Sequence, residues 1–444
     1  METTPSSSQN REGVYISTYG CQMNVNDTDR MESLLEMSGY EVVGTPDQAN
    51  MIIINSCSIR EKAVHKVRSE VGRYRKLRDK NSNLKIGVAG CVAQQEKKKL
   101  LKDIPMLDFV FGTDSIDKLP QIVKDLRTQD EKIVSTKFEH QSPYQIETLV
   151  KNPGIATFVN ITKGCDNFCT FCVVPFTRGR ERSRTQAEIL ADVQRLTQRG
   201  VKEVTLVGQN VNSYKSECGA DLADLLETLA TQTDIQRLRY TTSHPKDFDQ
   251  KLVDTMQKYR EKICDYVHLP VQSGNTDVLA RMNRGYSIET YLEKMEMIKK
   301  AIPGVSLSTD IIVGFPGETA EQFEDTINLV KKVGYETIFA FKYSARPFTK
   351  AARFEEQLTE NDKGERLQRL FAVQKEIAAK LAKKYEGQIL EVLVEETRDD
   401  GKVFGRSTQN KVVHFDGGKD LMGQTVKVRV LKAFPQTFRG ELLQ

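Results

Sequence analysis

Apolar runs and charged stretches alternate along the first 130 residues. The apolar runs predict strands at 14–19, 51–55, 84–89 and 108–112, because short apolar runs bounded by glycine or polar residues are typical of buried strands. The stretches between them predict helices at 27–38 and from about 61 to 78. Strands that alternate with helices favour an α/β fold with a doubly wound parallel sheet.

A second pattern of this kind runs from about residue 150 to 375. Its expected strands are 155–162, 203–208, 237–242, 266–269, 305–313 and 336–343, and its expected helices include 186–199, 220–230, 288–301 and 321–333. Six β/α units are too few for a closed eight-stranded barrel, but catalytic residues are still expected at the carboxyl ends of the strands. The polar stretch 130–153, with its turn signals, is interpreted as a linker.

The last part of the chain changes pattern again. One long charged helix is expected at 365–385, followed by short alternating runs at 389–395, 402–405, 411–415 and 425–430, with glycines between them. Such runs are typical of a small β-barrel that binds oligonucleotides, and positive charge comes from Lys427, Arg429, Lys432 and Arg439. The expected domains are therefore 14–130, 151–377 and 378–444.

Composition narrows the class of protein without naming it. The 444 residues suffice for two or three domains, and 39% hydrophobic with 28% charged residues is ordinary for a globular protein. We find no apolar run near the about 18 residues of a membrane span. The polar first twelve residues carry no signal-peptide core, so we expect a cytoplasmic protein with a short disordered tail and no membrane partner. The net charge of +4 is too small to establish a nucleic-acid partner.

The strongest chemical signal is a C-x3-C-x2-C array formed by Cys165, Cys169 and Cys172. Three closely spaced thiolates can bind three irons of a [4Fe-4S] cluster. The next cysteine is Cys218, so the fourth iron is expected to stay open for another ligand. A zinc site is the alternative, but structural zinc takes four ligands and usually paired C-x2-C knuckles, which this spacing does not provide.

Three further cysteines, Cys21, Cys57 and Cys91, each follow one of the first three predicted strands. Because sites in open parallel sheets form outside the carboxyl ends of strands, these thiols are expected to converge. Buried core cysteines are the alternative. The shared position at strand ends favours a second three-cysteine iron–sulfur site, and eight cysteines in a cytosolic chain point to metal or redox chemistry rather than disulfides.

An arginine-rich loop follows the C-x3-C-x2-C array. Arginine forks match phosphate oxygens, so we expect phosphate binding, with RNA as the candidate substrate, at Arg178, Arg180, Arg182 and Arg184. A solvated charged loop is the alternative interpretation of such a run.

Several motifs resemble those of the radical S-adenosylmethionine (SAM) methylthiotransferases, and most closely the MiaB-type enzymes that act on tRNA. The matching stretches are 19–24, 55–60, 90–94, 164–179 and 206–214. The resemblance implies an N-terminal methylthiotransferase domain, a radical SAM domain built as a partial (β/α)6 barrel, and a C-terminal TRAM domain. The family's usual Tyr-Ser-Pro-Arg-Pro-Gly-Thr-Pro is here Tyr-Ser-Ala-Arg-Pro-Phe-Thr-Lys, at 343–350.

The resemblance also implies cofactors and a reaction. Two [4Fe-4S] clusters are expected, an auxiliary one on the N-terminal cysteines and one on the C-x3-C-x2-C array that binds SAM and yields a 5'-deoxyadenosyl radical. SAM serves both as methyl donor and as radical source, and the C2–H of N6-isopentenyladenosine at position 37 of tRNA becomes C2–S–CH3. By position, SAM contacts are expected from Gly208, Gln209, Ser243, Gln272, Ser308 and Asp310, with ordinary turn chemistry as the alternative.

The implied partners are the tRNA anticodon stem-loop, an electron donor such as flavodoxin or ferredoxin, and an unidentified sulfur donor; the chain is expected to be a monomer. Three alternatives stay open at this point. Two are methylthiotransferases, for threonylcarbamoyladenosine in tRNA or for an aspartate of a ribosomal protein. The third is a two-cluster electron carrier, which would close each cluster with four ligands. Cys218 and Cys264 receive no role.

Overall fold

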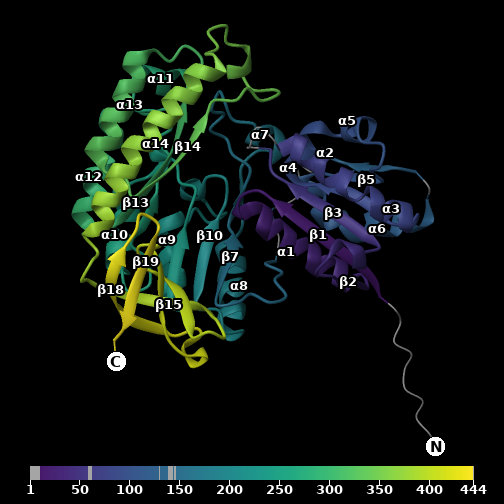
Figure 1. Ribbon diagram of the computed structural model, residues 1–444, viewed down its shortest axis with the longest axis horizontal. Helices are drawn as coiled ribbons and strands as arrows, with labels where there is room; N and C mark the ends of the chain where they lie inside the picture. Colours follow the sequence, from purple (N-terminus) through teal and green to yellow (C-terminus); the bar gives the residue numbers. More distant parts are fainter. Residues whose placement is uncertain (1–10, 59–62, 130, 139–143, 145–146, 444) are drawn as a thin grey trace, which may run out of the picture. The chain divides into compact units, whose positions relative to one another are not determined.

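The computed structural model describes residues 11–58, 63–129, 131–138, 144 and 147–443. The chain divides into two compact units, both drawn in Figure 1. The smaller unit contains the described part of residues 1–143 together with Thr148–Lys151 and Val173–Arg180. The larger unit contains the described part of Tyr144–Glu147, Asn152–Cys172 and Glu181–Gln444.

A six-stranded parallel sheet forms the centre of the smaller unit, in the order β2-β1-β3-β4-β5-β6. Figure 1 labels β1, β2, β3 and β5 of this sheet. Its strands are β1 (Glu12–Tyr19), β2 (Tyr40–Val42), β3 (Met51–Ser56), β4 (Lys85–Ala89), β5 (Phe109–Phe111) and β6 (Ile133–Ser135). Neighbouring residues Ile52 and Ile53 of β3 pack into separate clusters on opposite faces, because successive side chains of a strand point to opposite sides. The sheet is thus covered on both faces, as the predicted doubly wound fold requires.

The helices of the smaller unit are α1 (Gln22–Met37), α2 (Ala63–Arg73), α3 (Arg75–Lys80), α4 (Gly90–Glu96), α5 (Lys98–Asp103), α6 (Leu119–Thr128) and α7 (Val174–Thr177). Two expectations were wrong in detail. The helix expected at 27–38 begins directly after Cys21, whose extended backbone caps it. The helix expected up to residue 78 is two helices, separated at the buried Tyr74; its expected first two residues lie outside the described part.

Two strands, β2 and β6, were not predicted. Each has only three residues, which is too short for a periodic pattern to show. β6 lies inside the stretch interpreted as a linker, where it pairs with β5 and completes the sheet. Of that stretch, residues 130, 139–143 and 145–146 lie outside the described residues.

The larger unit contains six parallel strands that follow one another along the chain. They are β7 (Ala156–Asn160), β10 (Glu203–Val207), β11 (Arg237–Tyr240), β12 (Tyr266–His268), β13 (Ser306–Val313) and β14 (Thr337–Lys342). They form two three-stranded sheets, β11-β10-β7 and β12-β13-β14. An isolated β-bridge between Leu238 and Ile263 links β11 to the segment that precedes β12. The predicted partial (β/α)6 barrel is confirmed.

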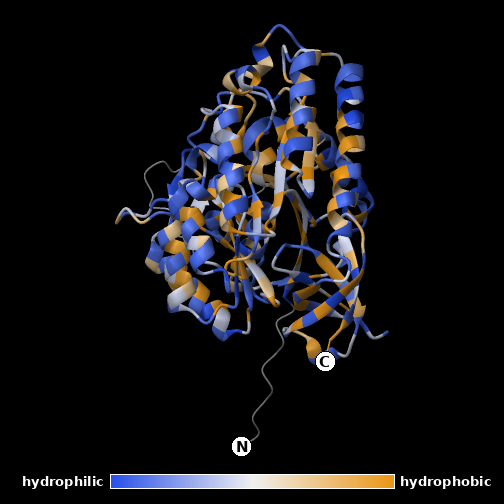
Figure 2. Cartoon of the chain, turned by 90° about the vertical axis from the view of Figure 1, so that its left-hand side faces the viewer, coloured by the Kyte–Doolittle hydropathy of each residue, from blue (hydrophilic) through white to orange (hydrophobic). Residues whose placement is uncertain are grey.

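Helices pack on the outer face of these strands. They are α8 (Gln186–Gln198), α9 (Leu222–Gln232), α10 (Gln250–Lys258), α11 (Thr276–Arg281), α12 (Ile288–Ala301), α13 (Ala320–Val333) and α14 (Glu360–Lys383). Capping boxes at Thr185 and Thr319 fix the starts of α8 and α13. Figure 2 shows hydrophilic and hydrophobic stretches on the helices of the chain. Apolar side chains of these outer helices, except those of α11, share one core with Leu238 and Leu307. Alternate strand residues therefore face the inside of the partial barrel.

A closed barrel ends the chain, in the order β15-β16-β17-β19-β18. Its strands are β15 (Ile389–Thr397), β16 (Lys402–Ser407), β17 (Val412–Asp416), β18 (Thr425–Ala433) and β19 (Thr437–Leu442). The sequence pattern missed β19 because Gly440 occupies an inward position, where a side chain would collide with Val428. Residue 378, the expected start of this domain, lies within α14.

Two short strands, β8 (Thr162–Lys163) and β9 (Arg182–Ser183), pair with each other beside β7. Within the described residues, we find no helix with the length and apolar character needed to cross a membrane.

Candidate active site

Cys21, Cys57 and Cys91 come together at one edge of the smaller unit's sheet. They follow β1, β3 and β4, which are adjacent, parallel strands, so their carboxyl ends meet. The strand order also reverses between β1 and β3, and ligands of doubly wound sheets bind at such reversals. Cys57 and Cys91 are buried, and all eight cysteines of the chain are free thiols.

Hydrogen bonds between Asn24 and Asn55 connect the segments that carry Cys21 and Cys57. Nδ2 of Asn24 donates to Oδ1 of Asn55 at 3.1 Å, and Nδ2 of Asn55 donates to the carbonyl of Asn24 at 2.8 Å. Gly90 has φ +85°, and a Cβ there would collide with Asn55. Glycine therefore allows the start of α4, with Cys91, to approach the ends of β1 and β3.

The electrostatics of these thiols differ. A hydrogen bond with Cys57 lowers the pKa of Cys21 to about 6; burial acts against this shift and Arg178 adds to it. Burial raises the pKa of Cys91, and Arg178 opposes that rise. The thiolate is the form of cysteine that binds metal. The lowered pKa of Cys21 and the positive charge of Arg178 near Cys91 both favour thiolates, as an iron–sulfur site requires.

Arg178 does not lie in a solvated phosphate-binding loop. Its side chain is buried, and Nη2 donates to Oδ2 of Asp27 on α1 at 2.7 Å. Arg184 is likewise buried and ion-paired with Asp192 at 2.7 Å. These two arginines are therefore not presented to a phosphate, which corrects the expectation for them. Arg180 is exposed and Arg182 is half-buried.

The second cysteine set occupies the loop that follows β8. Gly164 and Phe168 adopt left-handed backbone conformations, with φ +81° and +46°, which fold the loop back on itself. The backbone N–H of Cys172 donates to the carbonyl of Cys169 at 2.9 Å, and Nδ2 of Asn167 donates to Sγ of Cys165 at 3.5 Å. Burial raises the pKa of Cys165 to about 11, and Cys169 and Glu181 add to the rise, so this thiol is protonated until a metal binds.

The donor set of this loop fits an iron–sulfur cluster. Within the described part of the chain, no three His, Cys, Asp or Glu side chains are placed to share a single metal ion. Cysteine sulfurs are the ligands of such clusters, and the C-x3-C-x2-C loop offers three of them, at residues 165, 169 and 172.

The expected SAM-binding residues follow β10, β11 and β12 or lie within β13. Oε1 of Gln209, after β10, accepts from the backbone N–H of Gly164 in the cysteine loop at 2.5 Å. Gly208 lies against Thr162, where a side chain would collide with the threonine hydroxyl. Ser243, after β11, is buried and its Oγ has no hydrogen-bond partner. The structure thus brings the end of β10 to the second cysteine set.

The other three expected residues form one group. Gln272 has φ +74° and its backbone N–H donates to the carbonyl of Asp310 at 2.9 Å. Ser308 donates from Oγ to the Tyr266 hydroxyl at 2.7 Å and shares a hydrogen bond of 2.9 Å with Nδ1 of His268. Nε2 of His268 is 3.5 Å from Oδ1 of Asp310. Burial lowers the pKa of His268 and raises that of Asp310, and each group opposes the other's shift.

Arginines on the inner face of β11 connect the partial barrel to the C-terminal barrel. Arg239 donates to the carbonyls of Ser407 and Thr408 at 2.6 and 2.9 Å and from Nε to Glu203 at 2.9 Å. Burial acts to raise the pKa of Glu203, but Arg239 and Arg406 outweigh it and the net shift is downward. The turn between β16 and β17 is therefore anchored on the inside of the partial barrel.

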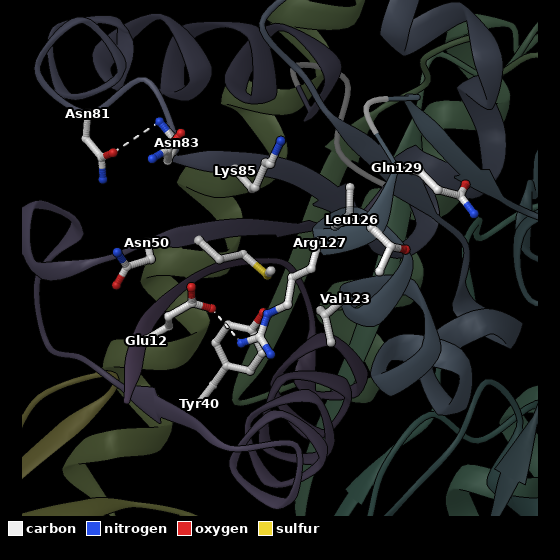
Figure 3. Close-up of a pocket in the computed structure, with 12 residues that line it drawn as sticks. Glu12, Tyr40, Asn50, Asn81, Asn83, Lys85, Val123, Leu126, Arg127 and Gln129 are labelled. Carbon is white, nitrogen blue, oxygen red and sulfur yellow. Dashed lines mark hydrogen bonds and ion pairs between the residues drawn. The ribbon is translucent and has the colours of Figure 1, made fainter. Parts of the chain in front are cut away.

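The structure also has two cavities of about 600 Å³, one in the smaller unit and one in the larger unit. Figure 3 shows the first, where Glu12 and Arg127 form an ion pair beside Tyr40. It opens at the amino ends of the strands, opposite the cysteines. The second lies on the C-terminal barrel, and its lining includes Arg398, Lys402, Phe404, His414, Phe434 and Arg439.

Known proteins resemble this chain along its whole length. Residues 13–112 match the uncharacterized protein family UPF0004, 159–330 the radical SAM superfamily and 383–443 the TRAM domain. The tRNA-2-methylthio-N(6)-dimethylallyladenosine synthase of Bdellovibrio bacteriovorus is 63% identical over 432 residues, which cover 97% of this chain and 95% of that protein. The chain belongs to the family of these synthases. The enzyme of the same name from Bacillus subtilis is 42% identical over 436 residues, 97% of this chain and 85% of that protein.

Solved structures support the fold of this synthase family member. The radical SAM methyltransferase TsrM of Kitasatospora setae superposes with a TM-score of 0.58 at 13% identity, covering 77% of each chain. The radical SAM enzyme OxsB gives a TM-score of 0.53 at 13% identity, covering 96% of this chain and 64% of that one. The predicted methylthiotransferase assignment is confirmed, with its N-terminal, radical SAM and TRAM domains in the predicted order.

Sequence reasoning missed several residues at the synthase's sites. Arg284 donates from Nη1 to Sγ of Cys169 at 3.3 Å, and nothing in the sequence links positions so far apart. Phe339 and Phe341 on β14 are each 46% exposed and pair in register with Asp310 and Ile312. The sequence predicted a strand here. Because Ile338 on one face is apolar, like Phe339 and Phe341 on the other, the pattern did not show which face is open.

Proposed function

We propose that this chain is a radical SAM tRNA methylthiotransferase that converts N6-isopentenyladenosine to its 2-methylthio derivative. The observation that carries this proposal is the three-cysteine loop at the carboxyl end of β8, in a chain 63% identical to a synthase with that product. The relatives' names favour the isopentenyl branch over the threonylcarbamoyl and ribosomal-protein branches.

Two [4Fe-4S] clusters fit the two cysteine sets. Cys21, Cys57 and Cys91 supply three thiols at adjacent strand ends, and Cys165, Cys169 and Cys172 supply three on one loop. SAM bound at the second set would supply the organic radical. The chain's own residues hold that loop in place: Gln209 accepts from Gly164, and Arg284 donates to Cys169.

SAM contacts are proposed from Gly208, Gln209, Ser243, Gln272, Ser308 and Asp310. Ser243 supports this because its buried hydroxyl lacks a partner, and a buried hydroxyl without one is costly. Asp310 supports it because its carboxylate is a hydrogen-bond acceptor within the strand ends. Ser308 Oγ is hydrogen-bonded to Tyr266 and His268, so its proposed contribution to the SAM site also includes orienting His268.

An apolar surface inside the partial barrel suits the isopentenyl group. Phe339 lies edge-on to His268, with ring centroids 5.8 Å apart, and Phe341 is the next inward residue of β14. Burying a five-carbon group there would contribute roughly 3–4 kcal/mol, at about 0.8 kcal/mol per carbon. His268 and Asp310 beside these rings supply polar atoms for the adenine.

RNA is proposed to bind the cavity on the C-terminal barrel and the exposed Arg180 and half-buried Arg182. The cavity combines Phe404, His414 and Phe434 with basic side chains, and nucleobases stack on aromatic rings while cations track the phosphates. Arg182 lies over the ring of Tyr144. We further propose the anticodon stem-loop as the recognised part of the tRNA, an external electron donor such as flavodoxin or ferredoxin, an external sulfur donor, and a monomeric chain.

Nucleoside mass spectrometry tests this function. In tRNA from cells lacking the protein, 2-methylthio-N6-isopentenyladenosine should disappear and N6-isopentenyladenosine should accumulate. The wild-type chain should restore it, and the Cys165→Ala variant should not. Loss of a threonylcarbamoyl-derived methylthio nucleoside instead would assign the chain to the sister branch.

A further inference from the structure

One turn after β14 has an unusual residue at its third position. The backbone N–H of Thr349 donates to the carbonyl of Arg346 at 3.3 Å, which closes a four-residue turn over 346–349. Pro347 occupies the second position of this turn, and Phe348, at the third, has φ +71°. This is the pattern of a type II turn, whose third position normally holds glycine because φ is positive there.

Phenylalanine is costly at this position of the turn. A bulky residue with positive φ is a genuine backbone outlier, because its Cβ comes too close to the following carbonyl oxygen. Burial in the core does not explain the choice of residue, since Phe348 is 55% exposed. Strained residues of this kind cluster at active sites and ligand clamps. The exposed ring of Phe348 is therefore a candidate for contact with a ligand.

Both ends of the loop that carries this turn are fixed within the larger unit. Tyr343, directly after β14, is buried, and its backbone N–H donates to the carbonyl of Val313 at 2.9 Å. Ala351 is also buried, and its backbone N–H donates to the carbonyl of Thr170 at 2.8 Å. Tyr343 and Ala351 belong to one apolar cluster, against which Phe171 packs. Because Thr170 and Phe171 belong to the C-x3-C-x2-C loop, the turn is held beside that loop.

The chemistry of this segment suits a nucleobase in RNA. Residues 343–351 include two basic side chains, Arg346 and Lys350, and no acidic one. Lys350 is exposed, as Phe348 is. Nucleobases stack on aromatic rings, while cations follow the phosphate backbone. The segment also follows the carboxyl end of β14, the strand whose two exposed phenylalanines form the proposed surface for the isopentenyl group.

We propose that Phe348 is a substrate-binding residue that stacks on a nucleobase of the anticodon loop next to the modified adenosine. The stacked base fixes the register of the RNA loop, so that the isopentenylated adenosine, and not its neighbour, enters the partial barrel. This inference rests on the proposed function, because it takes tRNA as the substrate.

The test measures binding of an isopentenylated anticodon stem-loop to the reconstituted full-length enzyme. Phe348→Gly should raise the dissociation constant roughly 5- to 150-fold, which corresponds to about 1–3 kcal/mol for one stacked base. Phe348→Tyr should bind as wild type does, because its ring still stacks. The matched control is Phe371→Ala, because Phe371 is 46% exposed but lies on the outer helix α14; its binding should equal that of wild type.

A second measurement identifies the stacked base. Single abasic nucleotides are placed in turn at the loop positions around the modified adenosine. One of these RNAs should bind wild type more weakly by a factor similar to that of Phe348→Gly. The same abasic nucleotide should have little effect on binding to Phe348→Gly, because the stacked pair is already broken. Losses that add at every position would overturn the inference.

Thermal denaturation separates a role in binding from a role in folding. Because glycine adopts positive φ without strain, Phe348→Gly should have a melting temperature equal to or above that of wild type. Unchanged RNA binding in Phe348→Gly would overturn the inference, whether its melting temperature falls or not. Unchanged RNA binding with slower cluster reduction by flavodoxin would assign the ring to a protein surface instead.

The same RNAs distinguish failure of this inference from failure of the proposed function. Methylthio product formed equally well by wild type and Phe348→Gly at low RNA concentration would contradict the inference alone. A wild-type enzyme that neither binds nor modifies the isopentenylated stem-loop would contradict the proposed function, and the inference with it.

Discussion

Nη1 of Arg284 donates a hydrogen bond to Sγ of Cys169 across 3.3 Å. Both residues are buried, and Nη2 of Arg284 is held by the carbonyl of Pro270 at 2.9 Å. A fixed cation therefore contacts one proposed ligand of the radical SAM cluster. Hydrogen bonds to cluster sulfurs are among the factors that set the reduction potential.

Replacing Arg284 should weaken SAM cleavage without removing the cluster. Changes to groups that support metal ligands cost about 10- to 100-fold in activity, so we expect a loss of that size in 5'-deoxyadenosine formation by Arg284→Met. The reduction potential should become more negative, because a positive charge beside the cluster is removed. Arg281→Lys, at a half-exposed arginine paired with Glu356, is the control, and equal cleavage by both variants would refute a role for Arg284.

The two cysteine sets should separate two activities. Changing Cys165, Cys169 and Cys172 to Ala should abolish reductive SAM cleavage, whereas changing Cys21, Cys57 and Cys91 should leave cleavage but remove the methylthio product. About four irons per chain should remain after either triple change. Methylthio product from the N-terminal triple variant would show that this set is not needed for sulfur transfer.

The buried Glu203–Arg239 pair should stabilise the packing of the C-terminal barrel on the partial barrel. Removing one partner of a buried pair costs about 3–5 kcal/mol, so Glu203→Gln should lower the free energy of unfolding by that order. An exposed pair, Lys402–Asp416, provides the control, since Lys402→Gln should cost at most about 1 kcal/mol. Equal denaturation midpoints for the two variants would contradict the role of the buried pair.

This stabilisation should depend on pH. The folded pKa of Glu203 is lowered from its ordinary value of 4.5, so its contribution is fully present above that value and is lost as the pH falls through the folded pKa. The difference in unfolding free energy between wild type and Glu203→Gln should therefore shrink below about pH 4.5. A difference that grows on acidification would mean that the sign of the shift is wrong.

Changes on the C-terminal barrel should weaken RNA binding in two distinguishable ways. Phe434→Ala should cost roughly 1–3 kcal/mol if a base stacks on that ring, with the salt dependence retained. Arg439→Gln should reduce the slope of log K against log salt by roughly 0.7–0.9 for each phosphate that the arginine neutralises. Salt titrations of tRNA binding measure both, and an unchanged affinity in the two variants would exclude this cavity as an RNA site.

The sequence was sufficient where function follows from strand order. Cys21, Cys57 and Cys91 could be placed together because each follows a strand, and adjacent parallel strands end at one edge. It was insufficient where a partner comes from far along the chain. Arg178 meets Asp27 across 151 positions, so a run of arginines looked like one phosphate-binding loop although two of its members form buried ion pairs. The structure distinguishes the buried, ion-paired Arg178 and Arg184 from the exposed Arg180 and the half-buried Arg182.

The measurement that tests the central claim most directly offers the reconstituted enzyme three versions of one anticodon stem-loop: unmodified, isopentenylated and threonylcarbamoylated. If the inner surface at Phe339 and Phe341 receives the isopentenyl group, methylthio product should form on the isopentenylated RNA roughly a hundred to a thousand times more efficiently than on the unmodified one, which corresponds to about 3–4 kcal/mol. A preference for the threonylcarbamoylated RNA, or equal turnover of all three, would contradict the proposed substrate.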